Sequence, residues 1–139
     1  MAGRINVADI LVKLQTVEDF EEQIKCSEEK CIIVDVHQNW CGPTTAVIPF
    51  YNSLWLEIEE CSQRITPCVM ELDDAGTIEA KILPMCKANG VDLKAQGCQP
   101  LFLVLRLGVC VGIVNSINTP SLRMLIDLNL PKLKKKEED

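Results

Sequence analysis

Short apolar runs and amphipathic stretches alternate along this chain, separated by polar turns. Runs rich in β-branched and aliphatic residues predict strands, because a strand covered on both faces is apolar throughout. Apolar residues that recur at steps of three and four predict helices with one buried face. These patterns predict strands at residues 10–14, 31–36, 67–72, 101–105 and 109–114, and helices at 17–27, 43–61, 78–85 and from 119 onwards.

The central feature is the strand at 31–36, which leads directly into the helix at 43–61. Its β-branched run is interrupted only by Asp35. Pro43 suits a first helical position, because its φ is preset and it has no N–H to leave unpaired. Cys41 then lies at the helix N-terminus, where the dipole should lower the pKa of its thiol. Pro49 falls inside the helical pattern and predicts a kink.

Three threonines mark expected helix starts, because a threonine hydroxyl accepts a hydrogen bond from the first helical turn. Thr16, Thr77 and Thr119 each precede a helical pattern. We expect Pro84 to break the second of these helices. The stretch 84–97 has no clear pattern and is expected to be a surface insertion.

Length and composition indicate one domain with a single core. The chain has 139 residues, of which 47% are hydrophobic, and a net charge of −6. We expect a domain over 1–130 and a charged, disordered tail over 131–139. The negative charge argues against nucleic acid and anionic membrane as partners. No apolar run has the length of a membrane span, and no secretory segment opens the chain, so a cytoplasmic location is expected.

The chain has eight cysteines and a single histidine, His37, and these limit the disulfides and metal sites that it could form. No two cysteines have the Cys-x-x-Cys spacing, and a cytoplasmic domain with an adequate core keeps its thiols reduced. We therefore expect most of the cysteines to be reduced and to pack as small buried hydrophobic side chains, and we expect neither a metal site nor a cofactor.

The turn segment resembles the active site of the thioredoxin family. The matching positions are Asp35, Trp40, Cys41, Gly42, Pro43 and Pro49, and Pro100 matches the family's cis-proline. The resemblance implies an α/β thioredoxin fold with a mixed sheet of about five strands flanked by helices. The order would be strand–helix–strand–helix–strand–helix–strand–strand–helix, with the insertion before the cis-proline.

The resemblance fails at Thr44, which stands in place of the second, resolving cysteine. In dithiol exchange a thiolate attacks a disulfide, and a second thiol then releases the product. The family pattern makes Cys41 the residual nucleophile and Asp35 a proton-transfer residue or a relic of one. The Thr44 hydroxyl cannot displace a disulfide, so the chain is not expected to be an enzyme of this kind.

Other residues have two interpretations each. Cys98, two residues before Pro100, is a candidate redox partner for Cys41, or both thiols line a docking surface. His37 replaces an aromatic residue of the family and is expected to be a packed side chain rather than a ligand. Trp55 lies off the helix stripe, where it either packs in an ordinary way or contacts a partner.

Three segments also resemble one branch of the family. These are residues 34–43, 97–103 and 118–122. They resemble the thioredoxin domains of ciliary and sperm proteins that carry nucleoside diphosphate kinase modules, and the thioredoxin-like light chains of axonemal outer-arm dynein. The resemblance implies a non-catalytic subunit of a ciliary or flagellar axoneme, with dynein chains or other axonemal proteins as partners. Its binding groove would comprise Trp40, Cys41, Gly42, Pro43, Thr44, Gln99 and Pro100. The alternative is a monothiol redox protein or sensor acting through Cys41.

Overall fold

The structure, a computed structural model, describes residues 6–38, 45–73, 76–93, 100–115 and 117–133. Its elements in chain order are η1 (Val7–Asp9), β1 (Val12–Leu14), α1 (Val17–Cys26), β2 (Cys31–His37), α2 (Ile48–Glu57), α3 (Cys61–Arg64), β3 (Ile65–Glu71), α4 (Thr77–Ala88), β4 (Leu101–Arg106), β5 (Val109–Asn115) and α5 (Thr119–Asn129). The five predicted strands are confirmed. The short helices η1 and α3 were not predicted.

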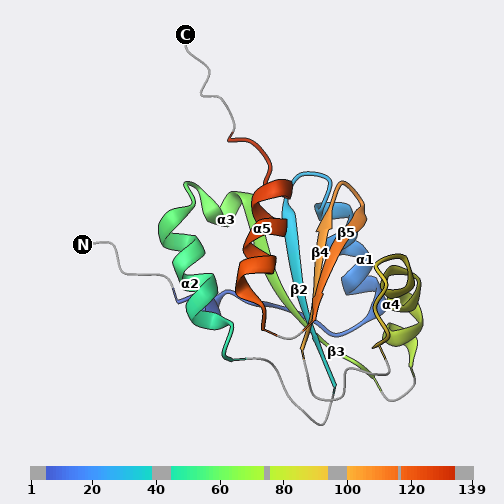
Figure 1. Cartoon of the computed structure of the whole chain (residues 1–139). Helices are drawn as coiled ribbons and strands as arrows, with labels where there is room; N and C mark the ends of the chain where they lie inside the picture. The colour runs from blue at the N-terminus through green and yellow to red at the C-terminus, as the bar shows by residue number, and fades with distance from the viewer. Residues whose placement is uncertain (1–5, 39–44, 74–75, 94–99, 116, 134–139) are drawn as a thin grey trace.

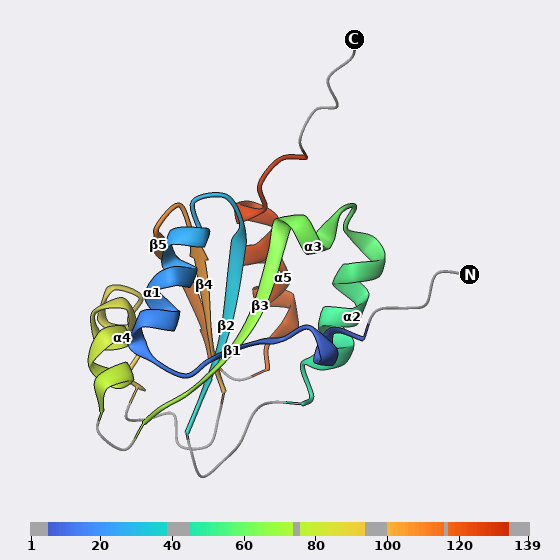
Figure 2. The ribbon, with the colours of Figure 1, turned by 180° about the vertical axis from the view of Figure 1, so that it is seen from behind.

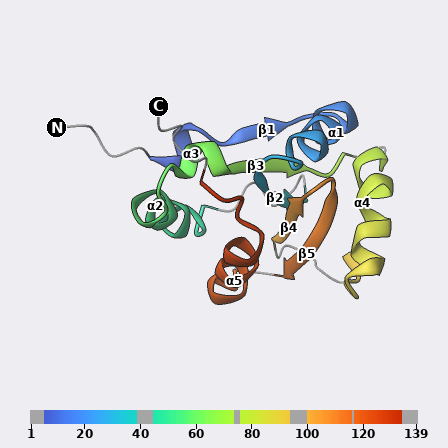
Figure 3. The same ribbon diagram turned by 90° about the horizontal axis from the view of Figure 1, so that it is seen from above.

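The five strands form one mixed sheet in the order β1-β3-β2-β4-β5 (Figure 1). Strands β1, β3 and β2 run parallel to one another. Strand β4 runs antiparallel to β2, and β5 runs antiparallel to β4. Helices α1 and α4 cover one face, as the reverse view shows (Figure 2), and α2 and α5 cover the other (Figure 3). The predicted mixed sheet flanked by helices is therefore confirmed.

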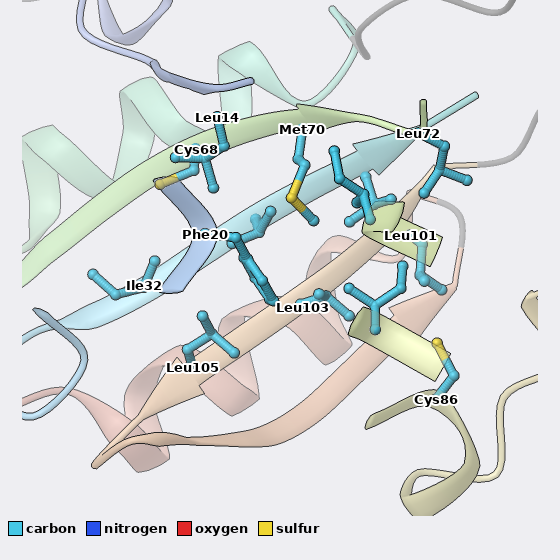
Figure 4. Close-up of a cluster of buried hydrophobic side chains, with 14 of the residues drawn as sticks. Leu14, Phe20, Ile32, Cys68, Met70, Leu72, Cys86, Leu101, Leu103 and Leu105 are labelled. Carbon is cyan, nitrogen blue, oxygen red and sulfur yellow. The ribbon is translucent and has the colours of Figure 1, made fainter. Parts of the chain in front are cut away.

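Strand β2 is the buried axis of the sheet. All seven of its residues are buried, because β3 and β4 pair along its two edges and helices cover both its faces. Side chains alternate between the faces. Ile32, Val34 and Val36 belong to the cluster under α1 and α4, and Cys31 and Ile33 to the cluster under α2 and α5. Figure 4 shows the first cluster, in which Phe20 of α1 lies against the leucines of β4.

The predicted start of α1 is confirmed in detail. Thr16 Oγ1 accepts a hydrogen bond of 3.1 Å from the Asp19 N–H. The Asp19 carboxylate accepts one of 3.2 Å from the Thr16 N–H in return. This reciprocal arrangement satisfies two donors that the first turn would otherwise leave unpaired.

The prediction of one kinked helix over 43–61 is wrong. Residues 45–47 form a turn, and α2 begins at Ile48, so Pro49 lies in its first turn. A proline in a first turn removes no intrahelical hydrogen bond, whereas one inside a helix would. Cys41 and Pro43, where the helix was expected to begin, lie outside the described residues, and so does the predicted lowering of the Cys41 pKa. The predicted helix is interrupted a second time at Glu60, whose φ of 52° is left-handed and not helical.

Helix α4 corrects two further predictions. Its start is capped by the Asp73 carboxylate, which accepts a hydrogen bond of 3.1 Å from the Ile78 N–H and another from the Thr77 hydroxyl. Thr77 is thus the first helical residue rather than the cap. The helix continues through Pro84 to Ala88, and Leu93 beyond it is only 3% exposed. The described part of the expected insertion therefore belongs largely to a helix and its core.

The β4–β5 turn is as predicted, with Leu107 and Gly108 at φ values of 57° and 81°. Two successive positive φ values match the twist of a tight hairpin. Helix α5 is capped one residue earlier than predicted. Asn118 Oδ1 accepts a 3.2 Å hydrogen bond from the Ser121 N–H, and Thr119 is already helical.

The expected tail at 131–139 is tied to the domain at its first residue, Pro131. Arg64 Nε donates a hydrogen bond of 2.9 Å to the Pro131 carbonyl. The charged residues 134–139 of the expected tail lie outside the described residues. Among the helices that the structure describes, none is long and apolar enough to cross a membrane.

Candidate functional site

The predicted site lies where β2 ends and β4 begins. Val36 pairs with Leu101 across these antiparallel strands, so His37 and Pro100 lie at the same edge of the sheet, the lower edge in Figure 1. Seven predicted site residues lie outside the described residues: Trp40, Cys41, Gly42, Pro43, Thr44, Cys98 and Gln99. The bond that was expected to be cis joins Gln99 to Pro100 and so also lies outside them. The structure thus brings together the two ends from which the predicted groove would be built.

Asp35 is a buried carboxyl group in the middle of the sheet. It is 1% exposed and lies in register with Val69 of β3 and Phe102 of β4. Alternation along β2 places it on the same face as Ile33, under α2. The buried carboxyl group that the family resemblance implies is therefore present, on the face of the sheet that α2 covers.

Tyr51 of α2 is the residue that sequence reasoning missed. Its side chain is 1% exposed, and its hydroxyl has no hydrogen-bond partner within the described structure. Burial raises the pKa of the Tyr51 phenol well above 10.0, and the negative charge of Asp35 raises it further. The phenol therefore stays neutral and protonated near Asp35. The two residues are far apart in sequence, so only the packing of α2 on the sheet reveals their relation.

His37 is the last residue of β2 and is 8% exposed. Its Nε2 lies 3.8 Å from Glu71 Oε1, beyond hydrogen-bond distance. Burial lowers the His37 pKa from its ordinary value of 6.5, and this effect outweighs the raising effect of the Glu71 carboxylate. At neutral pH His37 is therefore uncharged, and its contact with Glu71 is not an ion pair. This agrees with the prediction of a packed histidine.

Acid is expected to destabilise the protein through His37. Since the native His37 pKa lies below the unfolded value of 6.5, the unfolded chain binds this proton first as the pH falls. The contribution is fully present above about pH 6.5 and declines below it, until the native ring also protonates. Urea unfolding at about pH 7.5 and about pH 5.5 should show a smaller acid loss for His37→Gln than for the wild type. An equal loss in both proteins would contradict this assignment.

Six cysteines lie among the described residues, and all six are free thiols: Cys26, Cys31, Cys61, Cys68, Cys86 and Cys110. Burial raises the pKa of Cys31, Cys61 and Cys68 from 9.0 to about 12. Burial likewise raises the pKa of Cys110 to about 11 and that of Cys86 above its ordinary value. At a pKa of 11 to 12, fewer than roughly one thiol in 10⁴ is a thiolate at pH 7. The five thiols with raised pKa values are therefore poor nucleophiles.

The positions of three of these thiols also separate them from the predicted site. Cys31 begins β2, at the opposite end of the strand from His37. Cys68 and Cys86 belong to the cluster under α1 and α4, on the face of the sheet opposite Asp35.

Trp55 packs against the cluster under α2 and α5, and its Nε1 is buried without a hydrogen-bond partner in the described part of the chain. This favours ordinary packing over a partner contact. As for metals, the described ranges contain no group of three or more His, Cys, Asp or Glu side chains that could hold an ion.

Comparison with known proteins gives concordant matches. The family model described as Thioredoxin matches residues 11–84. Thioredoxin-1 of Caenorhabditis elegans is 32% identical over 87 residues, which cover 58% of this chain and 72% of that protein. Thioredoxin of Rattus norvegicus is 26% identical over 117 residues, 84% of this chain and 96% of that protein.

A longer relative is the thioredoxin domain-containing protein 3 homolog of Heliocidaris crassispina. It is 31% identical over 104 residues, which are 75% of this chain but only 11% of that protein. Among solved structures, the short form of thioredoxin f from spinach chloroplast has a TM-score of 0.60 and 20% identity, covering 93% of this chain and 98% of that one. At that identity the structural likeness concerns the fold alone.

Proposed function

Because this chain belongs to the thioredoxin family and has the thioredoxin fold, we propose that it is a thioredoxin-like interaction subunit that has lost dithiol turnover. The observation that carries the proposal is Thr44, which stands in place of the resolving cysteine. Cys41 can attack a disulfide, but the Thr44 hydroxyl cannot release the resulting mixed disulfide. The protein can therefore bind a partner without cycling.

Three of the described thiols support this proposal, because their burial makes them poor substitutes for the resolving cysteine. Cys31 and Cys61 are buried, with pKa values raised to about 12. Cys68, also at about 12, lies on the other face of the sheet from Asp35. Cys98 is the candidate that the sequence offers for the missing thiol, and pairing with Cys41 would require their Cα atoms to lie within about 7 Å.

The proposed docking surface is the groove of Trp40, Cys41, Gly42, Pro43, Thr44, Gln99 and Pro100. Grooves of this kind hold an extended partner segment by backbone hydrogen bonds beside a strand end, with side-chain pockets adding specificity. The meeting of His37 and Pro100 at one edge of the sheet is consistent with such a groove. An uncharged His37 adds no cost of burying a charge beneath a bound segment.

We further propose that the larger assembly is axonemal, and that this chain is a light chain or associated component of an outer-arm dynein-type complex. The support is the resemblance of residues 34–43, 97–103 and 118–122 to ciliary thioredoxin domains. Two relatives named as thioredoxin domain-containing proteins are much longer than this chain, so a thioredoxin domain can be part of a larger chain. This chain spans 11% of the Heliocidaris crassispina protein and 33% of the human thioredoxin domain-containing protein 6.

The loss of turnover is tested by insulin reduction. With NADPH and thioredoxin reductase, the purified protein should reduce insulin disulfides no faster than the background without it. C. elegans thioredoxin-1, a family member with sequence similarity to this chain, serves as the reference protein. Sustained turnover above background would refute a non-catalytic subunit and would favour a redox enzyme acting through Cys41.

The axonemal assignment is tested separately, by cross-linking mass spectrometry on isolated cilia and on cell extract from the same source. We expect cross-links from the groove side of this chain to dynein chains or to other axonemal proteins. Cross-links only to cytoplasmic proteins would contradict the axonemal assignment while leaving the loss of turnover intact.

A further inference from the structure

The six described cysteines lie in neighbouring pairs. In three of them burial raises the pKa of the thiol, and the charge of a second cysteine raises it further. The pairs are Cys31 with Cys61, Cys68 with Cys26, and Cys110 with Cys86. Two neighbouring thiols can form a reversible disulfide, so each pair is a candidate redox site.

Solvent access separates these pairs. Cys31 and Cys61 are both buried, so a dissolved oxidant meets neither thiol in the folded protein. Cys110 is partly exposed on β5, whereas Cys86 on α4 is buried. An oxidant can therefore reach one thiol of this third pair, while the other is shielded from solvent.

Cys26 is also partly exposed, but its neighbour Cys68 is fixed in the middle of the sheet. The backbone of Cys68 is in register with Val12 of β1 on one side and with Val34 of β2 on the other. Cys86 and Cys110 lie instead at the margin of the fold, in the last turn of α4 and on the last strand in sheet order. A small shift of a helix end can bring these two thiols together without disturbing the centre of the sheet.

Cys110 contacts the end of α4 directly. Its Sγ lies 3.9 Å from Asn89 Nδ2. Asn89 follows the last residue of α4, and its N–H donates a hydrogen bond of 3.1 Å to the Cys86 carbonyl. Residues three apart in a helical turn are neighbours on its surface, so Cys86 lies beside the residue that Cys110 touches. Both cysteines also pack in the cluster under α1 and α4, where α4 lies against β5 (Figure 3).

We propose that Cys86 and Cys110 form a disulfide when the folded protein meets a low-molecular-weight disulfide such as glutathione disulfide, and that this bond ties α4 to β5. The Cys110 thiolate attacks one sulfur of glutathione disulfide, which forms a mixed disulfide and releases one glutathione. The Cys86 thiol then loses its proton and attacks Cys110 Sγ, which releases the second glutathione. The two cysteines are thereby oxidised, and glutathione disulfide is reduced to two thiols that take up the two protons.

The chemistry of the two thiols makes this bond slow to form and slow to break. Burial raises the pKa of Cys110 to about 11, so its thiolate is scarce at pH 7 and the first attack is slow. A thiol of high pKa is also a poor leaving group, so a reductant breaks the finished bond slowly. The pair therefore suits a response to prolonged oxidation and not a catalytic cycle.

Peptide mapping of the oxidised protein tests this proposal. The full chain is incubated with glutathione disulfide under native conditions at about pH 8.5, and its remaining thiols are alkylated before digestion with trypsin. Cys86 falls in the tryptic peptide 82–87 and Cys110 in the peptide 107–123, and neither peptide has another cysteine. One linked mass therefore identifies the bond, and dithiothreitol should remove it. The loss of free Cys110 should accelerate about tenfold per pH unit between about pH 7 and pH 9, as its thiolate fraction rises.

Variants of the pair distinguish this bond from scattered oxidation. Cys86→Ser should leave Cys110 as a mixed disulfide with glutathione, and Cys110→Ser should leave Cys86 reduced. Cys26→Ser removes a partly exposed thiol outside the pair, so as the matched control it should leave the bond unchanged. The proposal is overturned if folded wild type gives no linked peptide, if Cys110 is linked to Cys98 instead, or if the link forms only in urea.

Urea unfolding of the unmutated protein measures the consequence of the bond. The disulfide closes the loop 86–110 and so restricts the unfolded chain, which stabilises the folded state. The oxidised protein should therefore unfold at a higher urea concentration than the reduced protein, and Cys86→Ser treated in the same way should show no such shift. An unchanged or lower midpoint in the bonded protein would mean that the bond does not fit the native fold, and would also overturn the proposal. This inference uses neither Cys41 nor Thr44, so its failure would leave the proposed function untouched.

Discussion

Replacing Thr44 by cysteine is expected to give the protein disulfide-reducing turnover. The change restores a thiol at the family's resolving position, three residues after Cys41. The second step then becomes an intramolecular attack on the mixed disulfide, which is much faster than waiting for an external thiol. In the insulin assay with thioredoxin reductase, Thr44→Cys should exceed the wild type at least about 100-fold.

Thr45→Cys is the matched control for this gain. It adds the same thiol to the next threonine, which is exposed and lies one residue beyond the required spacing. Thr45→Cys should remain at background, and adding Cys41→Ser to Thr44→Cys should abolish the gain. A folded Thr44→Cys protein without turnover would show that the chain lacks more than the resolving thiol. In that case the groove itself would differ from that of a dithiol enzyme.

Phe20→Ala is expected to cause the largest loss of stability. Phe20 is fully buried, and its ring lies among Ile32, Met70 and Leu103 at the centre of the cluster under α1 and α4 (Figure 4). Truncating a buried phenylalanine removes its burial energy and leaves a cavity, at a cost of about 3–5 kcal/mol. Since small domains unfold with about 5–15 kcal/mol, this is a large fraction of the total.

Urea unfolding of Phe20→Ala beside Glu22→Ala measures this effect. Glu22 lies on the same helix but is exposed, so its replacement should change the free energy of unfolding by less than about 0.5 kcal/mol. A loss below about 1 kcal/mol for Phe20→Ala would mean that the cluster collapses into the cavity or was loosely packed.

Sequence patterns predicted helix caps and turns reliably, because these depend on neighbouring residues. The capping of α1 by Thr16 and Asp19 and the Leu107–Gly108 turn follow from side chains that act on their own neighbours. The strands were equally predictable, because a buried strand needs an apolar run. Helix boundaries were less so. Pro49 is compatible with a kink or with a helix start, and the apolar pattern around it is the same in both cases.

The candidate site was only partly predictable for a related reason. Asp35 stands out in sequence because it interrupts an apolar strand, and its burial is confirmed. Tyr51 did not stand out, since an aromatic residue in a helix stripe is ordinary core. Its relation to Asp35 depends on where α2 crosses the sheet.

The amino-acid sequence by itself determined the family, the number and order of strands, and the missing second thiol at Thr44. Each of these depends on residue identity or on neighbours along the chain. Only the tertiary structure decided that His37 is uncharged beside Glu71 and that Cys31, Cys61, Cys68 and Cys86 are buried. These properties depend on desolvation and on contacts between distant segments, and both arise only when the chain has folded.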